Sequence, residues 1–298
     1  MKAESFSDDA DTFSHQGETC GSRQVVLTSA SQIEGRIMVR FIAAFSCLFL
    51  GMCGIAAATD AQPASRLDRI ISAGVLKVGS TGDYRPFTSK DPTTGEFSGF
   101  DIDQAKDLAK ALGVKLEVVP TSWPTMMKDF EAGKFDMAAG GVSVTLSRQK
   151  VGLFSIPYMR EGKTPITRCG DVGKYQTIAD IDKPDVTVIT NPGGTNEKFD
   201  RAHFKSAKIV VFPDNTKIFD QLAAGKADLM ITDASETRYQ QKLHKGVLCS
   251  VHPDKPFDFA EKAYWLQRDE YFKDFVDEWL HQAMNNGEYQ AVYDKWFK

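Results

Sequence analysis

The sequence predicts an α/β protein made of two similar halves. Short β-rich runs alternate with amphipathic helical stretches, an order typical of parallel sheets. One pattern also recurs: FEAGKFDMAAGGVS (residues 130–143) and LAAGKADLMITDAS (residues 222–235) share A-G-K-x-D followed by an apolar run. The beginnings of the halves match too, because GVLKVGSTGDYRPF (residues 74–87) and DVTVITNPGGTNEKF (residues 185–199) are both β-rich runs that end in small and polar residues.

The first half contains the clearest helix, DIDQAKDLAKALGV, over residues 101–114. Its apolar residues fall on one helical face, and Gly113 is the expected end; they are Ile102, Ala105, Leu108, Ala109 and Leu112. The run KLEVVP, residues 115–120, is the predicted next strand. Each repeated A-G-K segment predicts the end of a helix, a glycine turn and a buried strand.

Two halves of about a hundred residues each predict two lobes. We assign residues 62–160 together with residues 261–298 to one lobe, and residues 161–260 to the other. The chain is then expected to cross between the lobes near residues 158–163 and 257–262. Because ligands of open α/β sheets bind beyond the carboxyl ends of strands, we expect a small molecule in the cleft between the lobes.

The N-terminal residues predict export. From Met38 the chain has a positive Arg40, an apolar core over residues 41–55 and small residues at A-x-A spacing, which together indicate a signal peptide over residues 38–61. A membrane anchor is the alternative, since the apolar stretch is almost long enough to span a bilayer. Cleavage is favoured because small and then polar residues follow. For the polar residues 1–37, we expect that the start at Met1 lies upstream of the working start codon, which is Met38. A disordered extension is the alternative.

Charge and cysteine usage narrow the class of partner. The net charge is −4 and no basic stripe is present, which argues against nucleic acid as a partner. Cys169 and Cys249 remain after removal of the leader, an even number that favours a disulfide in an oxidising compartment; two separate buried thiols are the alternative. No Cys/His cluster has metal-ligand spacing, so we expect no metal site.

Five segments that follow predicted strands are the candidate site: residues 80–84, 121–123, 140–145, 191–197 and 232–236. The last of them, TDASE, places Asp233 and Glu236 three residues apart between a strand and a helix. D-x-x-E is close to a capping box, in which both carboxylates would only serve the helix end. Ligand binding and proton transfer are the alternatives.

The chain over about residues 66–298 resembles the extracytoplasmic solute-binding proteins of amino-acid importers. GEFSGFDIDQAKDLAKALG, GGVSVTLSRQKVGLFSIPY and TDAS carry this resemblance. Within that superfamily the chain is similar to periplasmic cyclohexadienyl dehydratases, through GDYRPF, PTSWPTMM, GKTPITRC, NPGGTNEKF, TDASE and HPDKPFDFAEKAY. The resemblance implies a type II periplasmic-binding-protein fold with a central cleft and two crossovers, and location in the periplasm with no stable membrane anchor after leader cleavage. It implies conversion of prephenate to phenylpyruvate and of arogenate to phenylalanine without a cofactor. A homo-oligomer is compatible with the sequence.

The resemblance also implies roles for individual residues. Arg148, helped by Ser143, is expected to clamp a ligand carboxylate, since a guanidinium fork matches it bidentately. The alternative is a surface arginine, although a positive charge at a helix start opposes the helix dipole. Trp123 and Tyr84 match aromatic residues of the cleft, and core packing is the alternative for both. Thr81 stands where binders of basic amino acids carry Asp, which favours a neutral or anionic ligand.

Anion contacts are expected after the first predicted strand of the second half. Gly194 and Thr195 precede a helix, where backbone N–H groups converge on an anion; a plain turn with Thr195 as N-cap is the alternative. We expect Glu197 to be structural. Lys163 is the candidate second cation for a substrate with two carboxylates, against a solvated hinge charge, and Asn191 is the candidate neutral hydrogen-bonder.

The resemblance decides between the interpretations of TDASE. Asp233 matches the carboxylate that pairs with a ligand α-ammonium in the binding proteins. Glu236 is the expected general acid, which protonates the leaving ring hydroxyl and needs a dry pocket to raise its pKa. The alternative function is an amino-acid-binding receptor of an ABC importer, with Glu236 as a helix cap. Glu236, Lys163 and Thr81 favour the enzyme.

Overall fold

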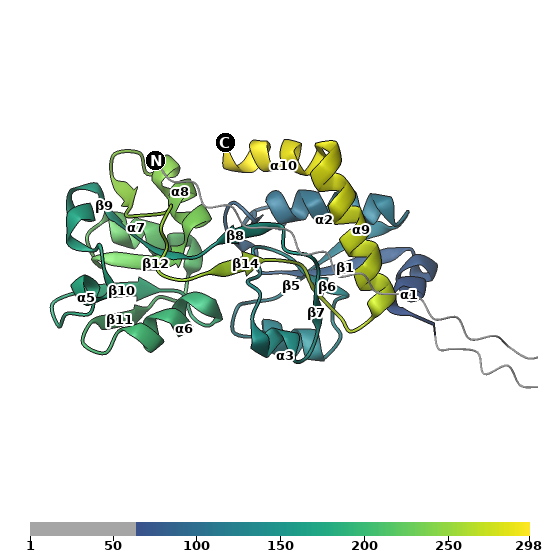
Figure 1. The fold of residues 1–298 in the computed structure, drawn as a ribbon, viewed down its shortest axis with the longest axis horizontal. Helices are drawn as coiled ribbons and strands as arrows, with labels where there is room; N and C mark the ends of the chain where they lie inside the picture. Colours follow the sequence, from purple (N-terminus) through teal and green to yellow (C-terminus); the bar gives the residue numbers. More distant parts are fainter. Residues whose placement is uncertain (1–63) are drawn as a thin grey trace, which may run out of the picture. The chain divides into compact units, whose positions relative to one another are not determined.

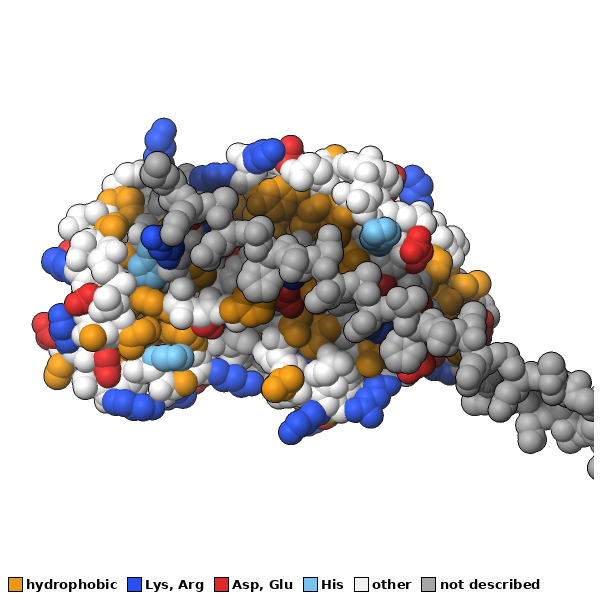
Figure 2. All heavy atoms as spheres, in the orientation of Figure 1, with side chains coloured by type: hydrophobic (Ala, Val, Ile, Leu, Met, Phe, Trp, Pro, Cys, Tyr) orange, Lys and Arg blue, Asp and Glu red, His pale blue; other side chains and the backbone are white. Residues whose placement is uncertain are grey.

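The computed structural model describes residues 64–298 (Figure 1). The predicted leader, residues 38–61, the extension before it and the cysteines at positions 20, 47 and 53 lie outside the described residues. Within the described range, none of the helices combines the length and the apolar character needed to cross a membrane. On the face drawn in Figure 2, Lys and Arg side chains are scattered rather than gathered into one patch.

The first of two five-stranded sheets has the order β5-β1-β6-β15-β7. Its strands are β1 (Val75–Ser80), β5 (Lys115–Pro120), β6 (Met137–Ala138), β7 (Leu153–Phe154) and β15 (Trp265–Leu266). β1 pairs in parallel with β5 and β6, whereas β15 pairs antiparallel with β6 and β7. The parallel part of this sheet is the part whose strands alternate with helices.

Within residues 64–298, six helices accompany this sheet, and side chains of the helices and strands together form the hydrophobic core. They are α1 (Arg66–Ala73), α2 (Phe100–Ala111), α3 (Met126–Glu131), α4 (Leu146–Gln149), α9 (Glu270–Asn286) and α10 (Glu288–Phe297). The helix predicted over residues 101–114 is α2, which buries Ile102, Ala105 and Leu108 and is followed by Gly113 at φ 68°. A small sheet of β2 (Asp83–Tyr84), β3 (Thr88–Lys90) and β4 (Phe97–Ser98) precedes α2.

The second sheet repeats the plan with the order β11-β10-β12-β9-β13. Its strands are β9 (Lys163–Arg168), β10 (Thr187–Thr190), β11 (Lys208–Val211), β12 (Leu229–Asp233) and β13 (Leu248–Ser250). β10 is parallel to β11 and β12, and β9 is antiparallel to β12 and β13. The accompanying helices are α5 (Ile178–Ile181), α6 (Gly194–His203), α7 (Ile218–Ala223) and α8 (Ala234–Leu243), with 3-10 turns at Cys169–Lys174 and Asn215–Lys217.

The sheets are mixed, which corrects the expectation of purely parallel sheets. β9 and β15 each come directly from the other sheet, so no helical crossover returns the chain to the same edge and an antiparallel strand results. The two connecting segments pair with each other as the antiparallel strands β8 (Met159–Glu161) and β14 (Ala260–Lys262) (Figure 1). This ribbon runs through the segments expected to be crossovers.

Two local features were visible in the sequence. The repeated A-G-K segments form a helix end, a glycine turn and a buried strand in both halves, with Gly133 at φ 66° and Gly225 at φ 73°. That left-handed conformation is one glycine adopts without the cost that other residues meet. Cys169 and Cys249 are joined by a disulfide with an S–S distance of 2.07 Å, which ties the first 3-10 turn to β13.

Candidate active site

The TDASE segment lies at the carboxyl end of β12, where α8 begins at Ala234. Asp233 occupies the N-cap position in extended conformation, but its side chain makes no capping hydrogen bond. Glu236 accepts a hydrogen bond from Thr232 Oγ1 at 2.6 Å instead of reaching back to the N-cap backbone. The capping-box alternative is therefore wrong, because both carboxylates have other partners.

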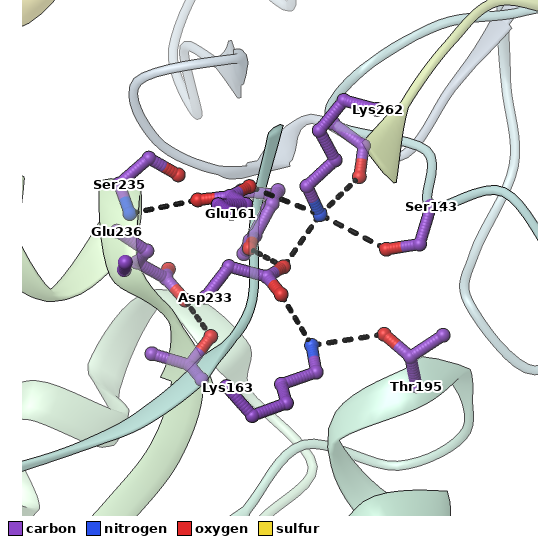
Figure 3. A network of polar contacts seen from close by, with 12 residues as sticks. Ser143, Glu161, Lys163, Thr195, Asp233, Ser235, Glu236 and Lys262 are labelled. Carbon is purple, nitrogen blue, oxygen red and sulfur yellow. Dashed lines mark hydrogen bonds and ion pairs between the residues drawn. The ribbon is translucent and has the colours of Figure 1, made fainter. Parts of the chain in front are cut away.

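Asp233 is held between two buried lysines (Figure 3). Lys163 Nζ donates to Asp233 Oδ1 at 2.7 Å and Lys262 Nζ donates to Asp233 Oδ2 at 2.5 Å. Tyr84, from β2, donates its hydroxyl to the same Oδ2 atom. Asp233 is 1% exposed and the lysines 2% and 0%. Burial opposes ionisation, but the two ammonium groups lower the pKa of Asp233 below its usual range.

Lys163 is not a solvated hinge charge. It begins β9, and its ammonium also donates to Thr195 Oγ1 at 3.0 Å and to Asn196 Oδ1 at 2.5 Å. Asn196 Nδ2 donates in turn to Asn191 Oδ1 at 3.1 Å and to Thr232 Oγ1 at 3.0 Å. This network links the start of α6 with the ends of β10 and β12, so the predicted residues of three segments meet at one place.

The sequence alone did not single out Lys262. Its ammonium donates to Gly141 O and Ser143 Oγ, both at 3.0 Å, and lies 3.6 Å from Glu161 Oε1. Glu161 is buried and accepts a hydrogen bond from Ser235 N at 2.8 Å, and burial together with the Asp233 charge raises its pKa. Lys262 and Glu161 come from the paired connecting strands β14 and β8, so only the crossover geometry brings them to Asp233.

Glu236 has the environment of a neutral acid at pH 7. The side chain is 1% exposed and its Oε2 atom accepts from Thr232 Oγ1. Burial raises the pKa of Glu236 to about 8, assisted by the negative charge of Asp233 and opposed by the Thr232 hydrogen bond. A carboxyl group with such a pKa keeps its proton at neutral pH and can give it to a leaving group.

A small cavity of about 20 Å³ lies beside Asp233, little more than the ~10–15 Å³ that one water needs. Seven of the predicted residues line it, together with Gly141, Asn196 and Lys262; the seven are Tyr84, Trp123, Ser143, Asn191, Gly194, Thr195 and Asp233. Glu236 lines a different hollow of about 500 Å³, which Asp83, Gln240 and His244 also line. Glu236 thus lies on the side of the Asp233 cluster that faces this larger hollow.

Arg148 is buried, which contradicts the surface-arginine alternative. The side chain is 8% exposed, its NH1 atom donates to Ser143 O at 2.8 Å, and the guanidinium lies 5.9 Å from the Trp265 ring centroid. Burial lowers the pKa of Arg148 to about 10, so it stays charged at neutral pH. No carboxylate within residues 64–298 lies at ion-pair distance from it. Arg148 therefore holds the Ser143 segment and does not itself line the small cavity.

The remaining predicted residues divide between cavity wall and support. Trp123 packs edge-on against Tyr84 at a centroid distance of 5.6 Å and donates its indole N–H to Asp83 Oδ1 at 3.0 Å. Thr81 has a buried hydroxyl without a hydrogen-bond partner in the described part of the chain and does not line the cavity. Asp101, in the predicted helix, accepts from Gly140 N and Gly141 N, both at 2.6 Å, and so fixes the loop that leads to Ser143.

The loop before α6 differs in detail from the expected anion site. The N-cap is Gly193 and not Thr195, whose hydroxyl faces Lys163. Gly193 N–H donates to Glu197 Oε2 at 2.6 Å, so Glu197 supports the loop. A Cβ atom on Gly193 would lie 2.9 Å from Pro124 N. A glycine is needed at this position because the backbone approaches the loop at Pro124 too closely for a larger residue.

The chain belongs to the bacterial extracellular solute-binding proteins, family 3, which match residues 76–298. It is 53% identical over 257 residues to the cyclohexadienyl dehydratase of Pseudomonas aeruginosa, covering 86% of this chain and 94% of that protein. It is 26% identical over 233 residues to an L-cystine-binding protein of Escherichia coli, covering 78% and 85% of the two chains. The family resemblance expected from the sequence is confirmed.

Solved structures show the same two-lobed fold. An ancestral amino acid-binding protein, described as a precursor of cyclohexadienyl dehydratase, is 37% identical with a TM-score of 0.72, covering 78% of this chain and 100% of that chain. An ancestral cyclohexadienyl dehydratase is 52% identical with a TM-score of 0.50, covering 79% and 98%. All the residues of the site described above fall within the segment that the family matches.

Proposed function

We propose that this protein is a cyclohexadienyl dehydratase that converts prephenate to phenylpyruvate and arogenate to phenylalanine. The observation that carries the proposal is Glu236, a buried carboxyl group with a pKa of about 8, at the edge of a cluster of buried cations. The 53% identity to the Pseudomonas aeruginosa enzyme supports it. An amino-acid receptor needs a free carboxylate for the ligand ammonium, and two lysines already engage Asp233.

Glu236 is the general acid in the proposed reaction. It gives its proton to the ring hydroxyl, which leaves as water, while the ring carboxylate leaves as CO₂ and its electron pair completes the aromatic ring. Glu236 then recovers one proton from solvent. The balance is prephenate dianion plus one proton giving phenylpyruvate monoanion, CO₂ and water. A positioned acid contributes about 10²–10⁴-fold to such a rate.

The cations of the site suit a substrate with two carboxylates. We assign carboxylate binding to Arg148 and Lys163, with the hydroxyl of Thr195, the amide of Asn191 and the loop at Gly194 as hydrogen-bonding partners. Trp123 and Tyr84 pack against the ring. Because the cavity of about 20 Å³ cannot hold such a molecule, the two sheets have to separate to admit it and close again around it.

The same proposal places the protein in the periplasm. The predicted signal peptide over residues 38–61 supports export. The description of the family as extracellular and the disulfide between Cys169 and Cys249 agree with an oxidising compartment.

A direct assay tests the function. Protein purified from cells that express the full chain is mixed with prephenate at neutral pH, and phenylpyruvate is followed by its absorbance in alkali. We expect formation far above the spontaneous rate. If the rate equals the spontaneous one and the protein binds a free amino acid tightly instead, it is a transport receptor.

The pH dependence of turnover should report the acid. The pKa of Glu236 is about 8, so we expect kcat to be level below pH 8 and to fall about tenfold per unit above it. Thr232→Val removes the hydrogen bond that lowers this pKa and should move the falling limb to higher pH. A kcat that rises through pH 8 would identify a base in place of an acid.

Arg148→Met should weaken substrate binding more than turnover. It removes a buried cation whose hydrogen bonds to a carboxylate are worth about 1.5–3 kcal/mol, so we expect KM to rise about 10–100-fold with a smaller change in kcat. Arg69→Met, on the exposed side of α1, is the matched control. An unchanged KM would remove the carboxylate role and leave Arg148 as a support for Ser143.

A further inference from the structure

The lysine cluster bears on which of the two substrates is preferred. Both oxygens of Asp233 are already paired with an ammonium group, at 2.7 Å from Lys163 and 2.5 Å from Lys262. Tyr84 donates to the second oxygen as well. Three of the about four acceptor positions of this carboxylate are therefore occupied, and a further ammonium at Asp233 would lie beside two ammonium groups.

The net charge of the buried groups around Asp233 also disfavours a further ammonium. Lys163, Lys262 and Arg148 are three buried cations, and among residues 64–298 the acids within ion-pair distance of the lysines are Asp233 and Glu161. With both acids ionised, these five groups together carry one net positive charge. In a buried site, such a charge favours an anion and disfavours another cation.

The two lysines line different hollows. Lys262 lines the small cavity beside Asp233, and Lys163 does not. Lys262 is held in place by Gly141 O and Ser143 Oγ, both at 3.0 Å, so its ammonium cannot swing away without breaking these bonds. A ligand group that approaches Asp233 from the cavity therefore meets the Lys262 ammonium.

We propose that Lys262 is a specificity-determining residue that makes the site favour the 2-keto acid over the corresponding 2-amino acid. The inference rests on the proposed function and gives it a substrate class: prephenate, which has a keto group beside its side-chain carboxylate, is preferred over arogenate, which has an ammonium there. The Lys262 charge attracts the negative end of a keto dipole, whereas it repels an ammonium. Specificity of this kind comes from a repulsive element as much as from an attractive one.

The test compares two ligands that differ only at this carbon. Phenylpyruvate and L-phenylalanine, the keto and amino products, are titrated calorimetrically into the wild-type full-chain protein, Lys262→Met and Lys255→Met. Lys255 is exposed and takes no part in the ion pairs of Lys163, Lys262 and Asp233, so it controls for net charge. We expect wild type and Lys255→Met to bind phenylpyruvate at least about tenfold more tightly than L-phenylalanine. In Lys262→Met, this ratio of affinities should be smaller by about tenfold or more.

Turnover gives a second measurement. The ratio of kcat/KM for prephenate to kcat/KM for arogenate should exceed about ten in wild type and fall in Lys262→Met, with Lys255→Met unchanged. Equal binding of the two products by wild type, or a preference for arogenate, overturns the inference even if Lys262→Met does not fold. A wild-type protein that binds the keto acid selectively but turns over neither substrate would refute the proposed function and leave the inference on the charge of the site standing.

Discussion

Glu236→Gln should lower kcat by about 10²–10⁴-fold and leave the fold intact. Glutamine has the shape of the protonated acid, and Thr232 Oγ1 can still donate to its amide oxygen, as it now donates to Oε2 at 2.6 Å. What is lost is the proton for the leaving hydroxyl. The measurement is kcat and KM for prephenate in the wild type, in Glu236→Gln and in Glu131→Gln, an exposed residue at the end of α3. A near-wild-type kcat in Glu236→Gln would reject the general-acid role.

Glu236→Gln should also change how the stability of the protein depends on pH, which tests the raised pKa of Glu236 separately from its role in catalysis. The pKa of Glu236 is about 8 in the folded protein against an ordinary value of 4.5, so the folded state binds the proton more tightly. Between these values the folded state carries more protons than the unfolded one, and stability declines as pH rises. Glutamine removes that decline. The Tm of Glu236→Gln minus the Tm of the wild type should therefore increase as the pH is raised from 5 to 9.

The sequence predicted the elements whose signal is local. α2 and β5 lie within about three residues of their predicted bounds, because one apolar face and a following β-rich run suffice to define them. The glycine turns of both repeats and the position of TDASE at a strand end were also predictable. The parallel-sheet prediction was incomplete, since the antiparallel strands β9 and β15 depend on how the chain passes between the sheets.

The chemistry of the site depended on contacts that no local pattern contains. Lys163 and Asp233 are separated by 70 residues in sequence, and Lys262 and Asp233 by 29. The sequence marked Asp233 through the resemblance to binding proteins and Lys163 as a second cation for a substrate with two carboxylates, but it offered no reason to pair them. Lys262 was passed over because a single lysine in DFAEKAY has no special spacing. A lysine between apolar neighbours in a segment expected to cross between lobes is the signal that could have identified it.

Removal of the Asp233 charge should destabilise the protein more than any other change in the cluster. Asp233→Asn leaves the buried ammonium groups of Lys163 and Lys262 without the carboxylate that compensates them. Breaking a buried ion pair from one side costs about 3–5 kcal/mol, because the charge that remains is uncompensated. We expect a loss of this size in the free energy of unfolding, measured by chemical denaturation at neutral pH.

The double variant Asp233→Asn with Lys262→Met separates charge from packing. Lys262→Met removes one ammonium and leaves Asp233 paired with Lys163, so it should cost less than Asp233→Asn. Because the double variant leaves one lysine without the Asp233 carboxylate and not two, it should be more stable than Asp233→Asn alone, a non-additive result expected of residues in direct contact. Strictly additive effects would mean that Asp233 and Lys262 do not stabilise each other in the folded protein, despite their contact at 2.5 Å.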